Sequence, residues 1–279
     1  MPISRAVRMT RTAISPRFAI RIFLGTETYL VWAMTPQNPS SQSNWPIGWT
    51  VRHVAETGST NDDLYLAARA GAADRSAIVA DFQTAGKGRL DRNWEAVRGT
   101  NLLVSLLFRY GNRDPSRYTR IVALAARAAC QTLAGVQPGI KWPNDLVVGA
   151  HKLAGLLAVG SPIEQFVVVG IGVNVAWAPS GATTLVTEAG KERAVSPLVL
   201  LGEMLHEIDR RADSDDTALH AEHKAALVTL GTRVRVQLSA SDLVGVAVDL
   251  DEKSRLLVRD DAGVMHVVDV GDVVHLRAQ

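Results

Sequence analysis

Residues 77–92 of the chain read AIVADFQTAGKGRLDR, an apolar run followed by a polar loop. The run at residues 77–82 has the length and composition of a buried β-strand. The loop behind it contains Gly86 and Gly88, which free the backbone to approach a ligand closely. It also holds three cations within six residues, which are Lys87, Arg89 and Arg92. This composition suits the binding of an anion, since an arginine can donate two parallel hydrogen bonds.

Two common phosphate-binding patterns do not fit this loop. A P-loop requires a lysine followed by serine or threonine, whereas Gly88 follows Lys87 here. A dinucleotide fingerprint requires a third glycine, and Leu90-Asp91 stands in its place. Taken alone, the loop is therefore either an anion-binding loop or an exposed surface loop.

Apolar periodicity predicts mixed helices and strands up to about residue 230 and strands alone after Gly231. A helix capped by Thr60 or Asn61, with Asp62 and Asp63 in its first turn, is expected to run to Ala70. The other expected helices are residues 116–133, 197–212 and 217–227. The other expected strands are residues 50–54, 101–109, 140–144, 146–148, 152–159 and 166–175, and four short ones between 234 and 270.

The 279 residues divide into three predicted parts. Residues 1–47 form a basic extension that we expect to be disordered. Its five arginines carry more positive charge than the net charge of +2 of the whole chain. An organelle transit peptide or an upstream start before Met34 would have the same composition. Residues 48–230 are the expected catalytic domain, and residues 231–279 a small β-barrel-like module.

Polar residues at the ends of the later strands are the next candidates. Lys141-Trp-Pro-Asn-Asp145 leads through a predicted hairpin to Lys152, which lies in an apolar strand beside Leu153. Lys152 is either a solvated edge charge or a buried cation directed at a phosphate. Asn174 follows Gly170 and Gly172, and glycines inside a strand indicate that something approaches the sheet closely.

Other chemistries find little support in the sequence. The single cysteine, Cys130, lies in an alanine-rich helical pattern and is expected to pack, so neither a disulfide framework nor a thiolate zinc site can form. His220 and His223 are expected on a solvated helix face. The body of the chain beyond residue 26 is slightly acidic, which argues against nucleic-acid binding, and no apolar run is long enough to cross a membrane.

In combination and order, these motifs resemble the biotin protein ligases over residues 50–279. The motifs are Ser59-Thr-Asn61, Gln83–Arg92 with Trp94, Gly99-Thr-Asn-Leu102, Lys141–Asp145, Lys152-Leu-Ala-Gly155 and Gly170–Asn174. The resemblance implies an α/β (α+β) catalytic domain with a mixed sheet, of the biotin/lipoate ligase type, and a C-terminal SH3-like barrel. It further implies activation of biotin by ATP to biotinyl-5′-AMP, assisted by Mg²⁺, and transfer to a lysine of a biotin carboxyl carrier domain.

The resemblance also assigns residues to roles. The catalytic cations would be Lys152, Arg89 and Arg92. The biotin site would be formed by Ser59, Thr60, Asn61, Gln83, Lys87, Gly88, Arg89, Lys152 and Gly155. The nucleotide would contact Arg92, Trp94, Asn144, Asn174 and Arg277, and Asp145 is the candidate Mg²⁺ ligand.

The chain departs from the family pattern at two places. The family loop usually reads Gly-Arg-Gly-Arg-x-Gly-Arg, whereas Lys87 and Asp91 here replace an arginine and a glycine. Residues 1–47 are too short and too broken by proline for the DNA-binding domain that many bacterial members carry. We therefore expect a cytoplasmic ligase without repressor function, whose oligomeric state is left open. The alternatives are a lipoate or octanoate ligase of the same fold and a non-catalytic biotin or adenylate sensor.

Overall fold

The computed structural model describes residues 45–90, 92–190, 195–238, 242–269 and 271–276, and the backbone of residues 19–24 and 27–32. Within residues 1–41, which form a unit of their own, strands β1 (Ala19–Leu24) and β2 (Glu27–Trp32) pair antiparallel. The rest of the predicted disordered extension lies almost wholly outside the described residues. The boundaries at 47 and 230 stay predictions.

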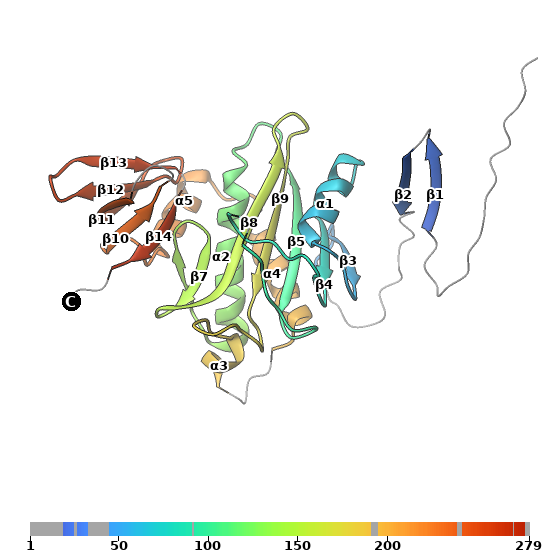
Figure 1. Ribbon diagram of the computed structural model, residues 1–279, viewed down its shortest axis with the longest axis horizontal. Coiled ribbons are helices and arrows are strands. Elements are labelled where there is room, and N and C mark those ends of the chain that lie inside the picture. The colour runs from blue at the N-terminus through green and yellow to red at the C-terminus, as the bar shows by residue number, and fades with distance from the viewer. Residues whose placement is uncertain are drawn as a thin grey trace, which may run out of the picture. The chain divides into compact units, whose positions relative to one another are not determined.

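A seven-stranded mixed sheet forms the centre of the second unit (Figure 1). Its strand order is β3-β4-β5-β9-β8-β7-β6, and every neighbouring pair is antiparallel except β3 and β4. The strands are β3 (Thr50–Val54), β4 (Ser76–Ala80), β5 (Leu102–Arg109), β6 (Gly139–Lys141), β7 (Asp145–Val148), β8 (His151–Ser161) and β9 (Phe166–Val173). The predicted mixed-sheet α/β fold is thus confirmed.

Helices cover the two faces of this sheet unequally. On one face, α1 (Thr60–Arg69) packs Leu64 against Ile78, Leu107 and Val168. The opposite face carries α2 (Ser116–Ala134) and α4 (Pro197–Ala212), followed by α5 (Asp216–Ala225); the short α3 is Leu185–Ala189. The large apolar core lies on this second face, and part of the α1 face is left for a cleft.

The start of α1 differs from the prediction. Its N-cap is Ser59, whose hydroxyl accepts a hydrogen bond from the backbone N–H of Asp62 at 3.4 Å, not Thr60 or Asn61. The reason is that Thr60 and Asn61 are already helical and direct their side chains into other hydrogen bonds. Asp62 and Asp63 lie in the first turn as expected.

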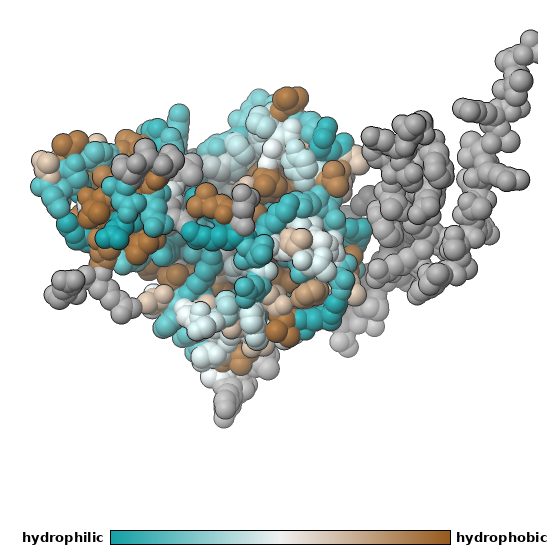
Figure 2. All heavy atoms as spheres, in the orientation of Figure 1, coloured by the Kyte–Doolittle hydropathy of each residue, from teal (hydrophilic) through white to brown (hydrophobic). Residues whose placement is uncertain are grey.

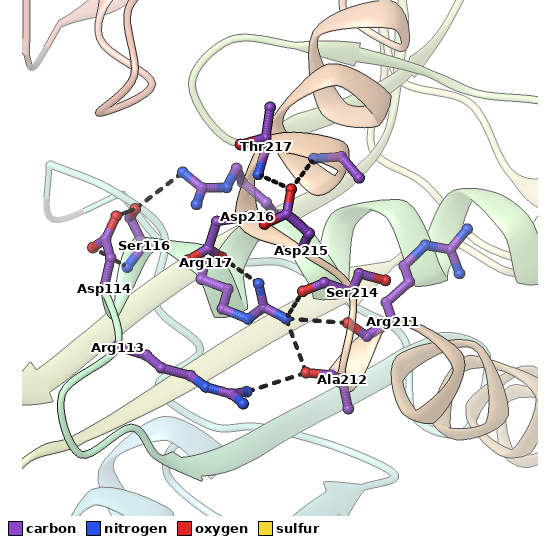
Figure 3. A network of polar contacts seen from close by, with 12 residues as sticks. Arg113, Asp114, Ser116, Arg117, Arg211, Ala212, Ser214, Asp215, Asp216 and Thr217 are labelled. Carbon is purple, nitrogen blue, oxygen red and sulfur yellow. Dashed lines mark hydrogen bonds and ion pairs between the residues drawn. The ribbon is translucent and has the colours of Figure 1, made fainter.

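Buried Arg117 fixes the turn between α4 and α5 against α2 (Figure 3). Its guanidinium donates to the carbonyl oxygens of Ala212 and Ser214 at 2.9 and 2.8 Å and pairs with Asp216. These carbonyls have no helical partner at the end of α4, so the arginine acts as a C-terminal cap. The face that carries α2 and α4, the packed face of the sheet, therefore contains a buried charge whose two terminal nitrogens both have hydrogen-bond partners.

Two residues of the packed face test sequence expectations. Cys130 is fully buried, as expected, and burial raises the pKa of its thiol to about 12. The expectation of a solvated histidine face on α5 is wrong for His223, which is only 6 % exposed. Its side of α5 packs toward α2 and Arg120, and burial lowers the pKa of His223 to about 4.

The C-terminal module is a five-stranded antiparallel sheet, consistent with the predicted SH3-like barrel. Its order is β13-β12-β11-β10-β14, formed by β10 (Arg233–Gln237), β11 (Asp242–Leu250), β12 (Leu256–Asp260), β13 (Met265–Val268) and β14 (Asp272–His275). Its interior, which includes Val234 and Val258, is continuous with the core under α2. On the viewed face, the described hydrophobic residues lie interleaved with hydrophilic ones (Figure 2). Among the described residues, no helix is long and apolar enough for a membrane span.

Candidate active site

A cleft of about 150 Å³ opens on the α1 face of the large sheet. Its walls are the N-terminus of α1, the loop that follows β4, and the neighbouring strands β5, β9, β8 and β7. Thirteen of the residues predicted for the site line it, namely Ser59, Thr60, Asn61, Gln83, Lys87, Gly88, Arg89, Arg92, Trp94, Asn144, Asp145, Lys152 and Gly155. The structure therefore gathers segments that lie almost a hundred residues apart in the sequence.

The floor of the cleft is made where strands lack side chains. On β9, a Cβ atom on Gly170 would lie 2.4 Å from Asn61 Oδ1, and one on Gly172 would lie 2.3 Å from Trp94 Cε2. On β8, Gly155 pairs with Gly172, and its Cβ would lie 3.0 Å from Lys152 Nζ. These glycines let the polar side chains above them approach the sheet.

A buried hydrogen-bond network occupies the Gly170 end. Gln83 Oε1 accepts from the backbone N–H and the hydroxyl of Thr60 at 2.7 and 2.9 Å. Ser105 Oγ lies 2.8 Å from Thr60 Oγ1 and donates to Asn61 Oδ1 at 2.7 Å. Asn61 Nδ2 in turn donates to the carbonyl of Leu157 at 3.1 Å. Because each partner fixes the next, this end offers preset donors and acceptors to a small polar ring.

The loop at residues 83–94 folds back on itself above the floor. The backbone N–H of Gly88 donates to the carbonyl of Arg92 at 2.7 Å, and that of Trp94 donates to the carbonyl of Gly86 at 2.9 Å. A Cβ on Gly86 would lie 2.8 Å from the carbonyl oxygen of Trp94, so the close backbone approach requires a glycine there. Asp91, one of the two departures from the family pattern, lies outside the described residues.

The cations of this loop are held by several parts of the chain. Lys87 Nζ pairs with Asp62 Oδ2 at 2.6 Å, so this lysine contacts the first turn of α1. Arg89 donates to Asn144 Oδ1 at 3.1 Å and to the carbonyl of Gly271, in the C-terminal module, at 3.2 Å. Arg89 thus joins the loop both to the β6–β7 turn and to the module.

Lys152 and Asp145 form the opposite wall. Lys152 Nζ pairs with Asp145 Oδ1 at 2.7 Å and lies 5.6 Å from the centre of the Trp94 ring. The lysine side chain is 40 % exposed and lines the cleft, so it is neither a solvated edge charge nor fully buried. Next to it, Asn144 Nδ2 donates to the carbonyl of Leu156 at 2.8 Å, which fixes the amide that receives Arg89.

One predicted residue does not line the cleft. Asn174 is buried at the end of β9, where its Nδ2 donates to the carbonyl of Lys152 at 3.4 Å, and it is not among the residues that line the cleft. Arg277 lies outside the described residues. Asn101, at the adjoining end of β5, accepts from the backbone N–H groups of Val175 and Trp177 at 3.1 and 3.2 Å.

Sequence reasoning missed Ser105, the residue that links Thr60 to Asn61. Its signal was a lone hydroxyl inside the apolar run at residues 101–109. Asp145 is the only carboxylate among the described lining residues, and no group of three His, Cys, Asp or Glu side chains that could hold a metal ion occurs among the residues described. A cation here would therefore need oxygen ligands from a bound phosphate as well as Asp145.

Comparison with known proteins agrees with this geometry. Residues 56–175 match the model of the biotin/lipoate A/B protein ligase family, and residues 229–276 match the biotin protein ligase C-terminal domain. A biotin--[acetyl-CoA-carboxylase] ligase of Mycobacterium tuberculosis is 37 % identical over 243 residues, covering 80 % of this chain and 88 % of that protein. One from Paracoccus denitrificans is 31 % identical, covering 75 % and 94 %.

A solved structure shares the fold. The biotin protein ligase from Aquifex aeolicus, in complex with biotin and ATP, superposes with a TM-score of 0.70 at 24 % identity, covering 82 % of this chain and 99 % of that one. The fold and the cleft thus define a protein of the biotin and lipoate ligase class. Because the Mycobacterium tuberculosis ligase matches most of both chains and the C-terminal domain is of the biotin protein ligase type, the chain belongs to the biotin protein ligase family.

Proposed function

We propose that this chain is an ATP-dependent ligase that joins biotin to a lysine of a biotin carboxyl carrier domain. The observation that carries the proposal is the arrangement of two unlike groups along β9. The neutral network of Thr60, Gln83 and Ser105 lies at Gly170, and Lys152 and Trp94 lie at Gly172. Two residues of a strand span about 7 Å, which suits a small acid with a polar ring at one end.

The first step joins two anions. The carboxylate of biotin attacks the α-phosphorus of ATP, the bond to the bridging oxygen breaks, and pyrophosphate leaves. Cations must draw the two anions together and hold the charge that develops. We assign this work to Lys152, Arg89 and Arg92, which line the same cleft.

We assign residues to the nucleotide by their position in the cleft. Asn144 lies beside Arg89 and Trp94 beside Lys152, and Arg92 lines the same cleft. Asn174 and Arg277 stay predictions that rest on family resemblance. Asp145 would hold Mg²⁺ together with oxygens of the triphosphate, a ligand set that suits this ion. When bound, the ion would neutralise the leaving pyrophosphate.

The second step transfers the activated acyl group. The neutral amine of the acceptor lysine attacks the acyl carbon of biotinyl-5′-AMP, forming an amide and releasing AMP. The adenylate must be kept from water until the acceptor arrives. The folded-back loop at residues 83–94, tied to Asp62 by Lys87 and to Gly271 by Arg89, is suited to shield it.

The acceptors we propose are carrier domains of biotin-dependent carboxylases, and the compartment is the cytoplasm. That compartment agrees with a chain whose one cysteine is buried. Action without nucleic acid stays a prediction from the slightly acidic body of the chain. A lipoate ligase is the less favoured candidate, because lipoate has no ureido group to engage the network around Gln83.

The deciding experiment mixes the purified chain with biotin, Mg-ATP and an apo carrier domain, and measures the acceptor by intact mass spectrometry. We expect the gain of one biotinyl group, lost in Lys152→Ala. Lys253→Ala, on an exposed turn of the C-terminal module, is the matched control and should keep full activity. Gain with lipoate alone would move the chain to the lipoate ligases, and pyrophosphate release without transfer would indicate activation only. If the acceptor gains no mass and no pyrophosphate is released, the result would support a sensor.

A further inference from the structure

Ser254, in the turn between β11 and β12, accepts two hydrogen bonds from the catalytic domain. Its hydroxyl accepts a hydrogen bond from Arg120 Nη1 at 2.8 Å, and its backbone carbonyl accepts one from Trp142 Nε1 at 3.1 Å. Arg120 and Trp142 are 5 % and 4 % exposed. Two buried donors from distant parts of the catalytic domain thus converge on one residue of the module.

Arg120 has few other acceptors. Its remaining partner is Ser116 Oγ at 3.2 Å, and in the described part of the chain no carboxylate lies within ion-pair distance of it. Burying a guanidinium is costly unless its donors are satisfied, and this burial lowers the pKa of Arg120. The Nε of Arg120 is buried without a hydrogen-bond partner among the described residues, so the hydroxyl of Ser254 is one of two acceptors that offset the cost of this burial.

The backbone of Ser254 is held in a strained conformation. Its φ of 61° lies in the left-handed region, which a non-glycine residue adopts at a cost. Asp251 enforces this shape, since its Oδ1 accepts from the backbone N–H groups of Lys253 and Arg255 at 3.0 and 2.9 Å. The turn is thereby built to present both oxygens of Ser254 to the catalytic domain.

Trp142 connects this contact to the cleft. Its own backbone N–H donates at 2.9 Å to the hydroxyl of Thr229, a fully buried residue of the chain leading into the module. Two residues beyond Trp142, Asn144 receives Arg89, and the next residue, Asp145, pairs with Lys152. The segment between Trp142 and Asp145 therefore orients two of the three proposed catalytic cations while the module holds its first residue.

We propose that Ser254 and Trp142 are positioning residues for the activation step, through which docking of the C-terminal module sets the geometry of Lys152 and Arg89. This inference rests on the proposed ligase function. It places the effect where the carboxylate of biotin and ATP would meet. The network around Gln83, which lies at the other end of the cleft, shares no hydrogen bond with the contact.

The test uses two variants of the full chain that remove one hydrogen bond each. Ser254→Gly deletes the hydroxyl and suits a positive φ, and Trp142→Phe deletes the indole N–H but keeps an aromatic ring in the core. Lys253→Ala, on the same turn, is the control. The readouts are biotin-dependent ATP–pyrophosphate exchange with varied ATP, biotin binding by calorimetry without ATP, and thermal unfolding.

We expect both variants to raise the KM for ATP or lower kcat by about tenfold or more, because small misplacements of catalytic groups have effects of this size. Biotin affinity should fall much less than the rate of activation, because the polar ring of biotin keeps its contacts around Gln83. The double variant should be no worse than the poorer single one, since both act through one contact. Unchanged exchange kinetics would overturn the proposal. So would a loss that tracks the melting temperature or falls equally on biotin binding.

Failure of the proposed function is distinguishable from failure of this inference. If the unaltered chain neither exchanges pyrophosphate nor modifies a carrier domain, the ligase function itself is wrong. If the unaltered chain is active and the variants match it, only the positioning role is wrong. Should Trp142→Phe unfold, Ser254→Gly decides the question, because its change lies at a half-buried turn residue.

Discussion

The two faces of the seven-stranded sheet are built from the same strands but with opposite contents. Toward α2 and α4, β5 presents Leu102, Leu106 and Phe108 to a continuous apolar core. Toward α1, the alternate positions include Ser105 on β5 and Gly170 on β9, and the space above them is the cleft. Because side chains alternate along a strand, one sequence encodes a packed face and a binding face together.

The difference shows that the binding face forms where side chains are absent from the strands. Its glycines contribute no side chains, so the polar groups of α1 and of the 83–94 loop can descend onto the sheet. Rigidity of those groups comes from the packed face, which holds the strands in place. Changes on the packed face should therefore act on stability, and changes on the cleft face on binding.

The largest expected effect is on the packed face. Leu106 is fully buried, so Leu106→Ala should lower the free energy of unfolding by about 2–5 kcal/mol through lost burial and a residual cavity. Urea unfolding followed by circular dichroism measures this. Biotin affinity of the folded fraction at low temperature should stay within about twofold; a tenfold loss of affinity would contradict the separation of the two faces.

An ionisable group on the packed side gives the next effect. Burial, with Arg120 and His220 nearby, lowers the pKa of His223 to about 4. The unfolded chain takes up this proton first, near pH 6.5, so stability is full above that pH and is lost as the pH falls toward 4. The loss attributable to His223 should be about 2 kcal/mol between pH 7.5 and 5.

The measurement is urea unfolding of the unaltered chain and of His223→Gln at several pH values. The variant should show a correspondingly smaller decline in stability over this range. Parallel declines in the two proteins would show that His223 is not the group responsible. Lys253→Ala, which removes no histidine, supplies the control variant, and its decline in stability should match that of the unaltered chain.

These cases also show what the sequence could predict. The strands of the C-terminal module followed from apolar periodicity, whereas the mixed sheet and most of the cleft residues followed from the resemblance of the motifs to the biotin protein ligases. The burial of His223 did not, because helical spacing identifies residues that share a face but not which face the neighbouring helix will cover. Ser105 was missed for a related reason: its role depends on Thr60 and Asn61, which are distant in sequence.

A cap position was predicted one or two residues too late for a physical reason. Ser59, Thr60 and Asn61 are all good N-cap residues, so propensity alone does not choose among them. Tertiary contacts decide, since Gln83 engages Thr60 and Leu157 engages Asn61, leaving Ser59 to cap the helix. Local preference here allows three caps, and the contacts of the binding face select one of them.

On the cleft face, Gly170→Ala should weaken biotin binding by about tenfold or more. A factor of ten in affinity corresponds to about 1.4 kcal/mol of binding free energy. The new Cβ would lie 2.4 Å from Asn61 Oδ1, and Asn61 is fixed by Ser105 and by the carbonyl of Leu157, so the network must shift. Calorimetric titration with biotin measures the change. Val169→Ala, next to it but facing the core, is the matched control and should bind biotin normally while melting earlier.

The smallest effect concerns Cys130, which lies on α2 within the packed core. Burial raises the pKa of its thiol to about 12, so almost no thiolate exists at pH 8 and thiol reagents should label it only after unfolding. Cys130→Ala should cost about 1 kcal/mol of stability, typical of a small core truncation, and leave biotinylation unchanged. Rapid labelling of the native protein, or loss of activity in Cys130→Ala without loss of stability, would mean that this thiol serves the cleft and that the two faces are not separate.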